Sequence, residues 1–157
     1  MEATSTEFRI EIPGSPVAWQ RPRAAPSASG KPIFFEAAKV KTWRQTIRLI
    51  AQEAMKDRPM LGGTPKNKIP LIAIINFYVP RPGRLYRKKD PETIIPMASR
   101  PDVENVYKGI ADALQGIVYY DDALIASAHI NKYYHEKAGK PRTTVEIIEV
   151  RDTEAIK

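Results

Sequence analysis

Carboxylates and a single lysine are concentrated between residues 102 and 122, and these are the residue types in the chain best suited to chemistry. The acidic residues are Asp102, Glu104, Asp112, Asp121 and Asp122, and the lysine is Lys108. Carboxylates that converge repel one another unless a divalent cation lies among them, and oxygen ligands of this kind suit Mg²⁺ or Mn²⁺ better than zinc. A lysine beside such a group suits phosphate binding or charge stabilisation in phosphoryl transfer.

A helix must position these side chains, and the sequence predicts one that begins at Asp102 and ends near Gly116. Pro101 keeps the residue before it extended, Asp102 is a favoured N-cap type, and glycine commonly ends helices. At about 100° per residue, the apolar side chains form one stripe and Glu104, Lys108 and Asp112 lie along the opposite side. A strand predicted at residues 117–120 could bring Asp122 back beside Asp102.

The same pattern has an ordinary interpretation, which the spacing does not exclude. Acidic residues at a helix start complement the macrodipole, and charges spaced i, i+4, i+8 commonly pair on a solvated surface. Two aspartates after a strand are also a common turn signal. From the spacing alone, a metal site and a solvated charged face both remain open.

Basic residues surround this stretch and point to a polyanionic partner. The formal net charge is +7, although many basic proteins bind no nucleic acid. Residues 81–100 form the most basic segment, lack clear periodicity and lead directly into Asp102, so they could draw phosphates toward the carboxylates. Arg21 and Arg23 flank a proline that keeps them extended, so they could reach phosphates, and a solvated loop explains them equally well. The candidate DNA contacts are Arg21, Arg23, Arg81, Arg84, Arg87, Lys88, Lys89 and Arg100.

The rest of the chain predicts an α+β domain, a small mixed β-sheet with two main helices packed on it. Apolar residues recur at helical spacing over 36–56, where we expect Trp43 to lie in the core. Alternating or β-branched runs predict strands at residues 8–12, 71–79, 123–134 and 143–150. With 157 residues, the chain is predicted to form a single domain, 1–157, with residues 1–7 frayed. The apolar residues 94–97 fit either a dimer interface or a strand junction.

Several function classes are disfavoured. The absence of cysteine excludes disulfides and thiolate metal sites, and no glycine-rich phosphate loop or Ser/His/Asp arrangement is present, so we expect no small-molecule cofactor. No apolar run is long enough to cross a bilayer and no basic-then-apolar leader is visible, so we expect a cytoplasmic protein without a membrane partner.

Three consecutive motifs resemble the signature of the RusA family of Holliday junction resolvases, which are often carried by prophages. The family pattern is Lys/Arg-Pro-Asp-x-Asp-Asn-Leu-x-Lys, then Asp-Ala-Leu-x-Gly, then Asp-Asp. The chain has Pro101-Asp102-x-Glu104-Asn105-x-x-Lys108, Asp112-Ala113-Leu114-x-Gly116 and Tyr120-Asp121-Asp122-x-x-Ile125. Only residues 100–125 match at the level of motifs, although about three-quarters of the chain fits in kind.

The resemblance implies a homodimeric, RusA-like, Mg²⁺-dependent crossover junction endodeoxyribonuclease, with Mn²⁺ expected to substitute. It implies that Asp102, Glu104 and Asp122 hold the metal, with Asp121 as the alternative to Asp122, and that Lys108 is catalytic. Glu104 departs from the usual aspartate and reaches one methylene further, so the metal geometry can differ. The resemblance also favours DNA contacts by Lys132 and by the Arg-Pro-Arg segment. A non-catalytic nucleic-acid-binding protein and a nuclease for other branched DNA remain the alternatives.

Overall fold

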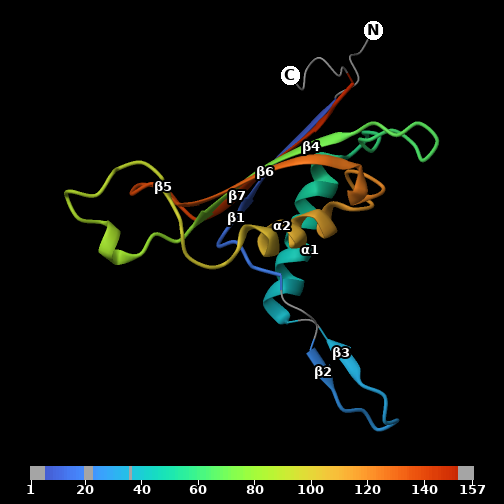
Figure 1. The fold of residues 1–157 in the computed structure, drawn as a ribbon, viewed down its shortest axis with the longest axis horizontal. Helices are drawn as coiled ribbons and strands as arrows, with labels where there is room; N and C mark the ends of the chain where they lie inside the picture. Colours follow the sequence, from blue (N-terminus) through green and yellow to red (C-terminus); the bar gives the residue numbers. More distant parts are fainter. Residues whose placement is uncertain (1–5, 20–22, 36, 152–157) are drawn as a thin grey trace.

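The computed structural model describes residues 6–19, 23–35 and 37–151, and it has a mixed five-stranded sheet with two helices on one face (Figure 1). β4 and β6 run parallel and the other neighbouring strands run antiparallel. The predicted α+β class and the mixed sheet are confirmed. The strand order is β1 (Glu7–Pro13), β7 (Arg142–Glu149), β4 (Leu71–Val79), β6 (Ile125–Tyr134) and β5 (Ile95–Pro96).

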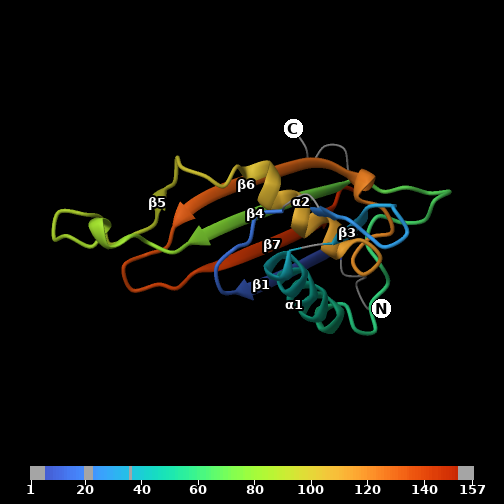
Figure 2. The ribbon, with the colours of Figure 1, turned by 90° about the horizontal axis from the view of Figure 1, so that it is seen from below.

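Both helices lie against the same face of the sheet (Figure 2). α1 (Ala38–Ala54) buries Val40, Trp43, Ile47 and Ala51, which recur at helical spacing. α2 (Val103–Leu114) lies in the long connection between the parallel strands β4 and β6, as a parallel pair requires. The prediction that Trp43 lies in the core is confirmed, because only 8% of it is exposed.

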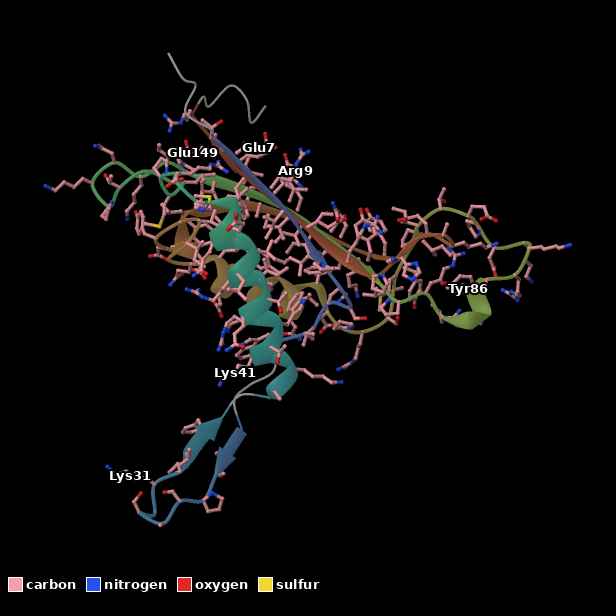
Figure 3. The ribbon with its side chains drawn as sticks, turned by 180° about the vertical axis from the view of Figure 1, so that it is seen from behind. Glu7, Arg9, Lys31, Lys41, Tyr86 and Glu149 are labelled. Atoms are coloured by element: carbon pink, nitrogen blue, oxygen red, sulfur yellow. The ribbon has the colours of Figure 1, made fainter. Side chains whose placement is uncertain are left out.

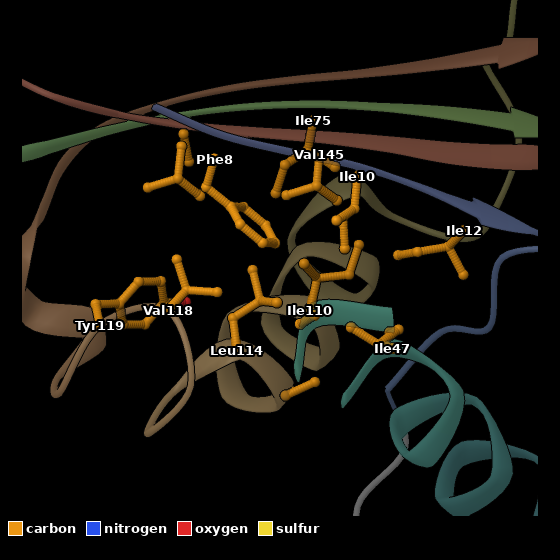
Figure 4. Close-up of a cluster of buried hydrophobic side chains, with 14 of the residues drawn as sticks. Phe8, Ile10, Ile12, Ile47, Ile75, Ile110, Leu114, Val118, Tyr119 and Val145 are labelled. Carbon is orange, nitrogen blue, oxygen red and sulfur yellow. The ribbon is translucent and has the colours of Figure 1, made fainter. Parts of the chain in front are cut away.

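The core lies between the helices and the sheet (Figure 4). β1 alternates buried and exposed residues, so Phe8, Ile10 and Ile12 all face the helices. They meet Ile110 and Leu114 of α2, which are fully buried. Burying each side chain of this size contributes about 1.5–3 kcal/mol. This packing fixes α2 on the sheet and leaves its opposite side to solvent.

Two segments project from this body in different directions (Figure 1). The first, which we call the arm, is residues 23–35, a hairpin of β2 (Arg23–Ala25) and β3 (Ile33–Phe35). The second, the basic loop, is residues 81–100 and contains η1 (Gly83–Leu85) and β5. Lys31 lies on the arm and Tyr86 on the basic loop (Figure 3). Since β5 pairs with the end of β6, the apolar residues 94–97 contribute to a strand junction.

The strand predicted at residues 117–120 does not form, and this prediction is wrong. The chain instead turns at the end of α2, where Ile117 and Val118 donate backbone hydrogen bonds to Leu114. Gly116 has a φ of +85°, which favours glycine. Val118 and Tyr119 are fully buried, and the Tyr119 hydroxyl donates to the Ala111 carbonyl at 2.7 Å. The apolar run therefore completes the core beneath α2, which explains its composition without a strand.

The frayed N-terminus predicted for residues 1–7 falls partly outside the described residues, which begin at residue 6. Glu7 is already paired with β7, and the Thr6 carbonyl accepts a hydrogen bond from Glu149. The last two residues of the predicted frayed segment are therefore part of the sheet edge.

Arg81 organises the basic loop from inside, and this differs from its predicted role as a DNA contact. Only 6% of the residue is exposed. Its guanidinium donates hydrogen bonds to the carbonyls of Leu85, Thr93, Pro91 and His135, at distances between 2.6 and 3.4 Å. It also lies 5.4 Å from the centre of the Tyr86 ring. A guanidinium has five N–H donors, and carbonyls of the loop already occupy most of them, so Arg81 is not available to phosphate while the loop keeps this fold.

We expect Arg81→Met to destabilise the basic loop by leaving buried carbonyls without donors. The free energy of unfolding, measured by urea denaturation, should fall by about 2–3 kcal/mol, and chymotrypsin should cut faster after Tyr86. Arg84→Met is the matched control, because Arg84 is in the same loop but exposed. Unchanged stability together with weaker DNA binding in Arg81→Met would restore the phosphate-contact role.

Candidate active site

The first two candidate carboxylates lie at the start of α2, as the sequence predicted. Asp102 is the N-cap residue, and its backbone carbonyl accepts bonds from Asn105 and Val106 at 3.2 and 3.4 Å. Its side chain makes no capping hydrogen bond, and both Asp102 and Glu104 are exposed. The helix start thus presents two carboxylates to solvent, and neither is used to complete the helix.

Lys108 lies one turn further along the same exposed side of α2, against a residue that the sequence analysis did not single out. Its ammonium lies 4.3 Å from the centre of the Trp19 ring, a cation–π contact. The Trp19 backbone N–H donates to the Asn105 carbonyl at 3.0 Å, which fixes the tryptophan on α2. The sequence signal that could have indicated this contact is an aromatic residue, Trp19, two positions before the basic Arg-Pro-Arg segment.

This arrangement bears on the ordinary interpretation of the charges on α2. Within the part of the chain that the structure describes, Lys108 makes no ion pair within 4.0 Å with Glu104 or Asp112. The ion-paired ladder that the ordinary interpretation describes is therefore not formed by Lys108 with these two carboxylates. The Lys108 ammonium lies over the Trp19 ring instead, and Lys108, Glu104 and Asp112 are all exposed.

The remaining carboxylates form a second group at the other end of α2. η2 (Asp122–Leu124) follows the buried turn, and the Asp121 side chain caps it by accepting from the Ala123 N–H at 2.9 Å. The backbone N–H of Asp122 donates to the Gln115 side chain at 3.0 Å. The pKa of the Asp122 carboxyl is raised above its usual value. The largest cause is partial burial, and the next is repulsion from Asp112 and Asp121. The capping role of Asp121 leaves Asp122 as the better candidate ligand of the two.

The structure does not bring Asp122 beside Asp102, so this sequence expectation is wrong. Among the described residues, no three His, Cys, Asp or Glu side chains lie close enough together to hold a metal ion. The reason is the turn after α2, which places Asp122 near Asp112, whereas Asp102 lies at the opposite end of a helix about 18 Å long. All the candidate donors are carboxylate oxygens and fit a hard cation, but one chain in this conformation does not assemble them into a single three-carboxylate centre.

Lys132, the other predicted DNA contact near the site, holds the chain that leads into Asp102. It lies on the helix-covered face of β6, and its ammonium donates to the carbonyls of Ser99 and Pro101 at 2.7 and 2.8 Å. These carbonyls come immediately before the N-cap of α2. Lys132 therefore acts on the position of Asp102 through the backbone.

We expect Lys132→Met to reduce catalysis more than DNA binding. Loss of the two hydrogen bonds should let the 99–102 backbone shift, which should lower kcat by about 10–100-fold. DNA affinity and its salt dependence should change little. A direct phosphate contact would behave differently, because its loss should weaken binding to all DNA and reduce the salt slope by about one.

The other predicted DNA contacts fall into three groups. Arg84, Lys88, Lys89 and Arg100 are exposed on the basic loop. Arg87 is also exposed but pairs with Asp90 at 3.1 Å, and its hydrogen bonds lower the pKa of that carboxyl. Arg21 lies outside the described residues, and Arg23 is described only through its backbone in β2. The first group is therefore the best placed to reach a phosphate backbone.

The α+β fold presents carboxylates and a lysine on the exposed side of one helix, directly after a cationic loop, and these residue types suit chemistry on phosphodiesters. The model of the family described as Endodeoxyribonuclease RusA matches residues 13–148, so the chain belongs to the RusA endodeoxyribonuclease family. It is an endodeoxyribonuclease whose substrate is DNA. No helix in the described part of the chain is long and apolar enough to cross a membrane.

The chain is also similar to the uncharacterized protein YqaN of Bacillus subtilis (strain 168). The two are 29% identical over 148 residues, which covers 91% of this chain and 96% of YqaN.

Proposed function

We propose that the protein resolves Holliday junctions by paired symmetric nicks, with Mg²⁺ as cofactor, in DNA recombination and repair. The observation that carries the proposal is the exposed side of α2, where Asp102, Glu104 and Lys108 face solvent in a chain that matches the RusA family. We also propose a prophage origin, because members of the RusA family are often carried by prophages.

The residues have distinct roles in this proposal. The ammonium of Lys108 binds the scissile phosphate and stabilises the negative charge that develops on it. Asp102 and Glu104, which lie together at the start of α2, are the carboxylates that we assign to the divalent cation, which would supply Lewis-acid polarisation of the phosphate oxygen. Asp122, which the family resemblance also assigns to the metal, lies at the other end of the helix in this conformation. The exposed cations of the basic loop bind the DNA backbone and offset the negative charge of these carboxylates.

A homodimer follows from the symmetry of the substrate. A four-way junction contains two equivalent strands to be cut, so two copies of the site related by a two-fold axis match it. We therefore propose that the active species on the junction is a two-fold homodimer.

The test is incubation with a synthetic four-way junction and a linear duplex of matched sequence, with Mg²⁺ or with EDTA. Paired symmetric nicks in the junction alone, and only with the metal, are the expected result. Tight junction binding without cleavage in Mg²⁺ or Mn²⁺ would identify a non-catalytic binding protein. Equal cutting of both DNAs would retain the nuclease but remove the junction specificity, and cutting of forks or flaps in preference would identify a nuclease for other branched DNA.

A further inference from the structure

The arm exposes large apolar side chains that the fold does not use. Phe34 is 67% exposed and Ile33 is 55% exposed, although both belong to the regular strand β3. Their partners across the hairpin are Ala24 and Ala25, which are too small to cover them. Because successive side chains of a strand point to opposite faces, the ribbon is apolar on both sides. An exposed phenylalanine and isoleucine on a projecting hairpin indicate a binding surface that a ligand covers.

The arm has a defined shape despite its projection from the body. Gly30 donates a backbone hydrogen bond to Ser27 at 3.1 Å, and the Ser27 hydroxyl bonds to Ser29 and to the Lys31 carbonyl. Gly30 has a φ of +79°, which favours glycine at the turn. The tip is therefore closed by its own hydrogen bonds, and an ordered ribbon loses less entropy on binding than a flexible loop would.

The base of the arm lies next to the candidate active site. Trp19, whose ring contacts the Lys108 ammonium, is four residues before Arg23. The Cα atoms of Trp19 and Arg23 are therefore at most about 14 Å apart. The other end of the arm leads into α1 within three residues of Phe35. A nucleic acid whose phosphate lies at Lys108 would therefore have the base of the arm, at Arg23, close to the adjoining nucleotides.

Charge favours DNA over protein as the occupant. Residues 23–35 include Arg23 and Lys31 and no acidic residue, and Lys31 lies at the projecting end (Figure 3). A flat protein partner would cover one face of the ribbon and leave the apolar side chain of the other face in water. Unstacked bases offer apolar surfaces on both sides, and Phe and Ile are side chains that proteins use as wedges between bases.

We propose that the arm enters the branch point of the DNA, with Phe34 stacked on an unpaired or end-of-helix base and Ile33 against the opposite side. This proposal rests on the junction-cleaving function proposed above, and it adds to that function the element that opens the branch point and so selects branched over linear DNA. Lys31 neutralises a phosphate as the tip enters.

The test uses a four-way junction with 2-aminopurine beside the branch point, whose fluorescence rises on unstacking, and Ca²⁺ in place of Mg²⁺ to limit cleavage. Wild-type protein should raise the fluorescence. Phe34→Ala should lose most of that rise and bind the junction about 5- to 150-fold more weakly, with linear-duplex binding unchanged. Phe34→Tyr should behave as wild type. Leu49→Ala is the matched control, because Leu49 has the same 67% exposure but lies on α1.

Wild-type fluorescence and affinity in Phe34→Ala would overturn the proposal. So would a shift of this variant to a smaller species in light scattering, because the arm would then be a contact between two copies. Circular dichroism establishes that the variant is folded. Failure of the wild-type protein to bind or cut the junction would count against the proposed function itself, and this is observed before any variant is compared.

Discussion

Asp102→Asn is expected to abolish junction cleavage while junction binding is retained or strengthened. Asp102 caps α2 through its backbone only, so its carboxylate can be neutralised without loss of a capping hydrogen bond. Loss of a ligand to a divalent cation removes several kcal/mol of charge stabilisation in the transition state, which corresponds to a cleavage rate about 10³-fold lower or more. Removing a negative charge near the phosphate also reduces repulsion of DNA.

The measurement is a single-turnover cleavage assay in Mg²⁺ beside a gel-shift titration in Ca²⁺. Glu53→Gln is the matched control for net charge, because Glu53 is exposed and belongs to α1, not to the segment that supplies the candidate ligands. It should cleave as wild type does. If Asp102→Asn cleaves at the wild-type rate, the assignment of this carboxylate to the cation is wrong. Equal strengthening of binding in both variants would mean that net charge, not local repulsion, controls affinity.

Periodicity predicted the parts of the fold that are built on one repeating face. β4 was predicted with its observed bounds, because a nine-residue run rich in β-forming residues ends at a proline that cannot continue the ladder. The Trp43 stripe of α1 followed from the same reasoning at helical spacing, whereas the Asp102 start of α2 followed from Pro101 and from the preference for aspartate at the N-cap. Long segments that bury one side carry this signal in every turn or pleat, so tertiary packing and local pattern agree.

Short segments did not carry enough signal. Residues 117–120 have strand composition, yet burial of Val118 and Tyr119 in a turn satisfies that composition equally well. The three-residue strands of the arm are too short to show a period among alanines, serines and prolines. Burial of the Arg81 guanidinium depends on carbonyls up to 54 residues away in the chain, which local sequence cannot indicate.

The candidate site was predicted in its residues but not in its arrangement. Asp102, Glu104 and Lys108 belong to one helix and its N-cap, so helical geometry alone was sufficient to predict that their side chains are exposed. The place of Asp122 depends on how the chain leaves that helix, and the predicted strand took it in the wrong direction. The contact between Trp19 and Lys108 joins residues that are 89 positions apart in the sequence, so no local pattern predicts it.

Lys108→Met should reduce the cleavage rate by about 10²–10³-fold with a small change in junction affinity. The expected size is that of removing one charged donor aimed at a developing negative charge. Lys108 makes no ion pair with Glu104 or Asp112, so its loss leaves neither of these carboxylates without a partner and should not unfold the protein. Lys108→Arg should recover only part of the activity, because its planar guanidinium cannot place a point charge at the same distance.

Trp19 then serves to test how the lysine is held. Trp19→Leu should lower the rate by about two- to fivefold, the size of an exposed cation–π contact, since the ammonium would no longer be fixed over the ring. If the tryptophan acts through the lysine, Trp19→Leu should have no further effect on rate in the Lys108→Met background. Independent effects that multiply in the double variant would show instead that Trp19 contacts DNA by itself. Trp19→Phe keeps an aromatic face and should stay within about twofold of wild type, which separates loss of the ring from loss of packing.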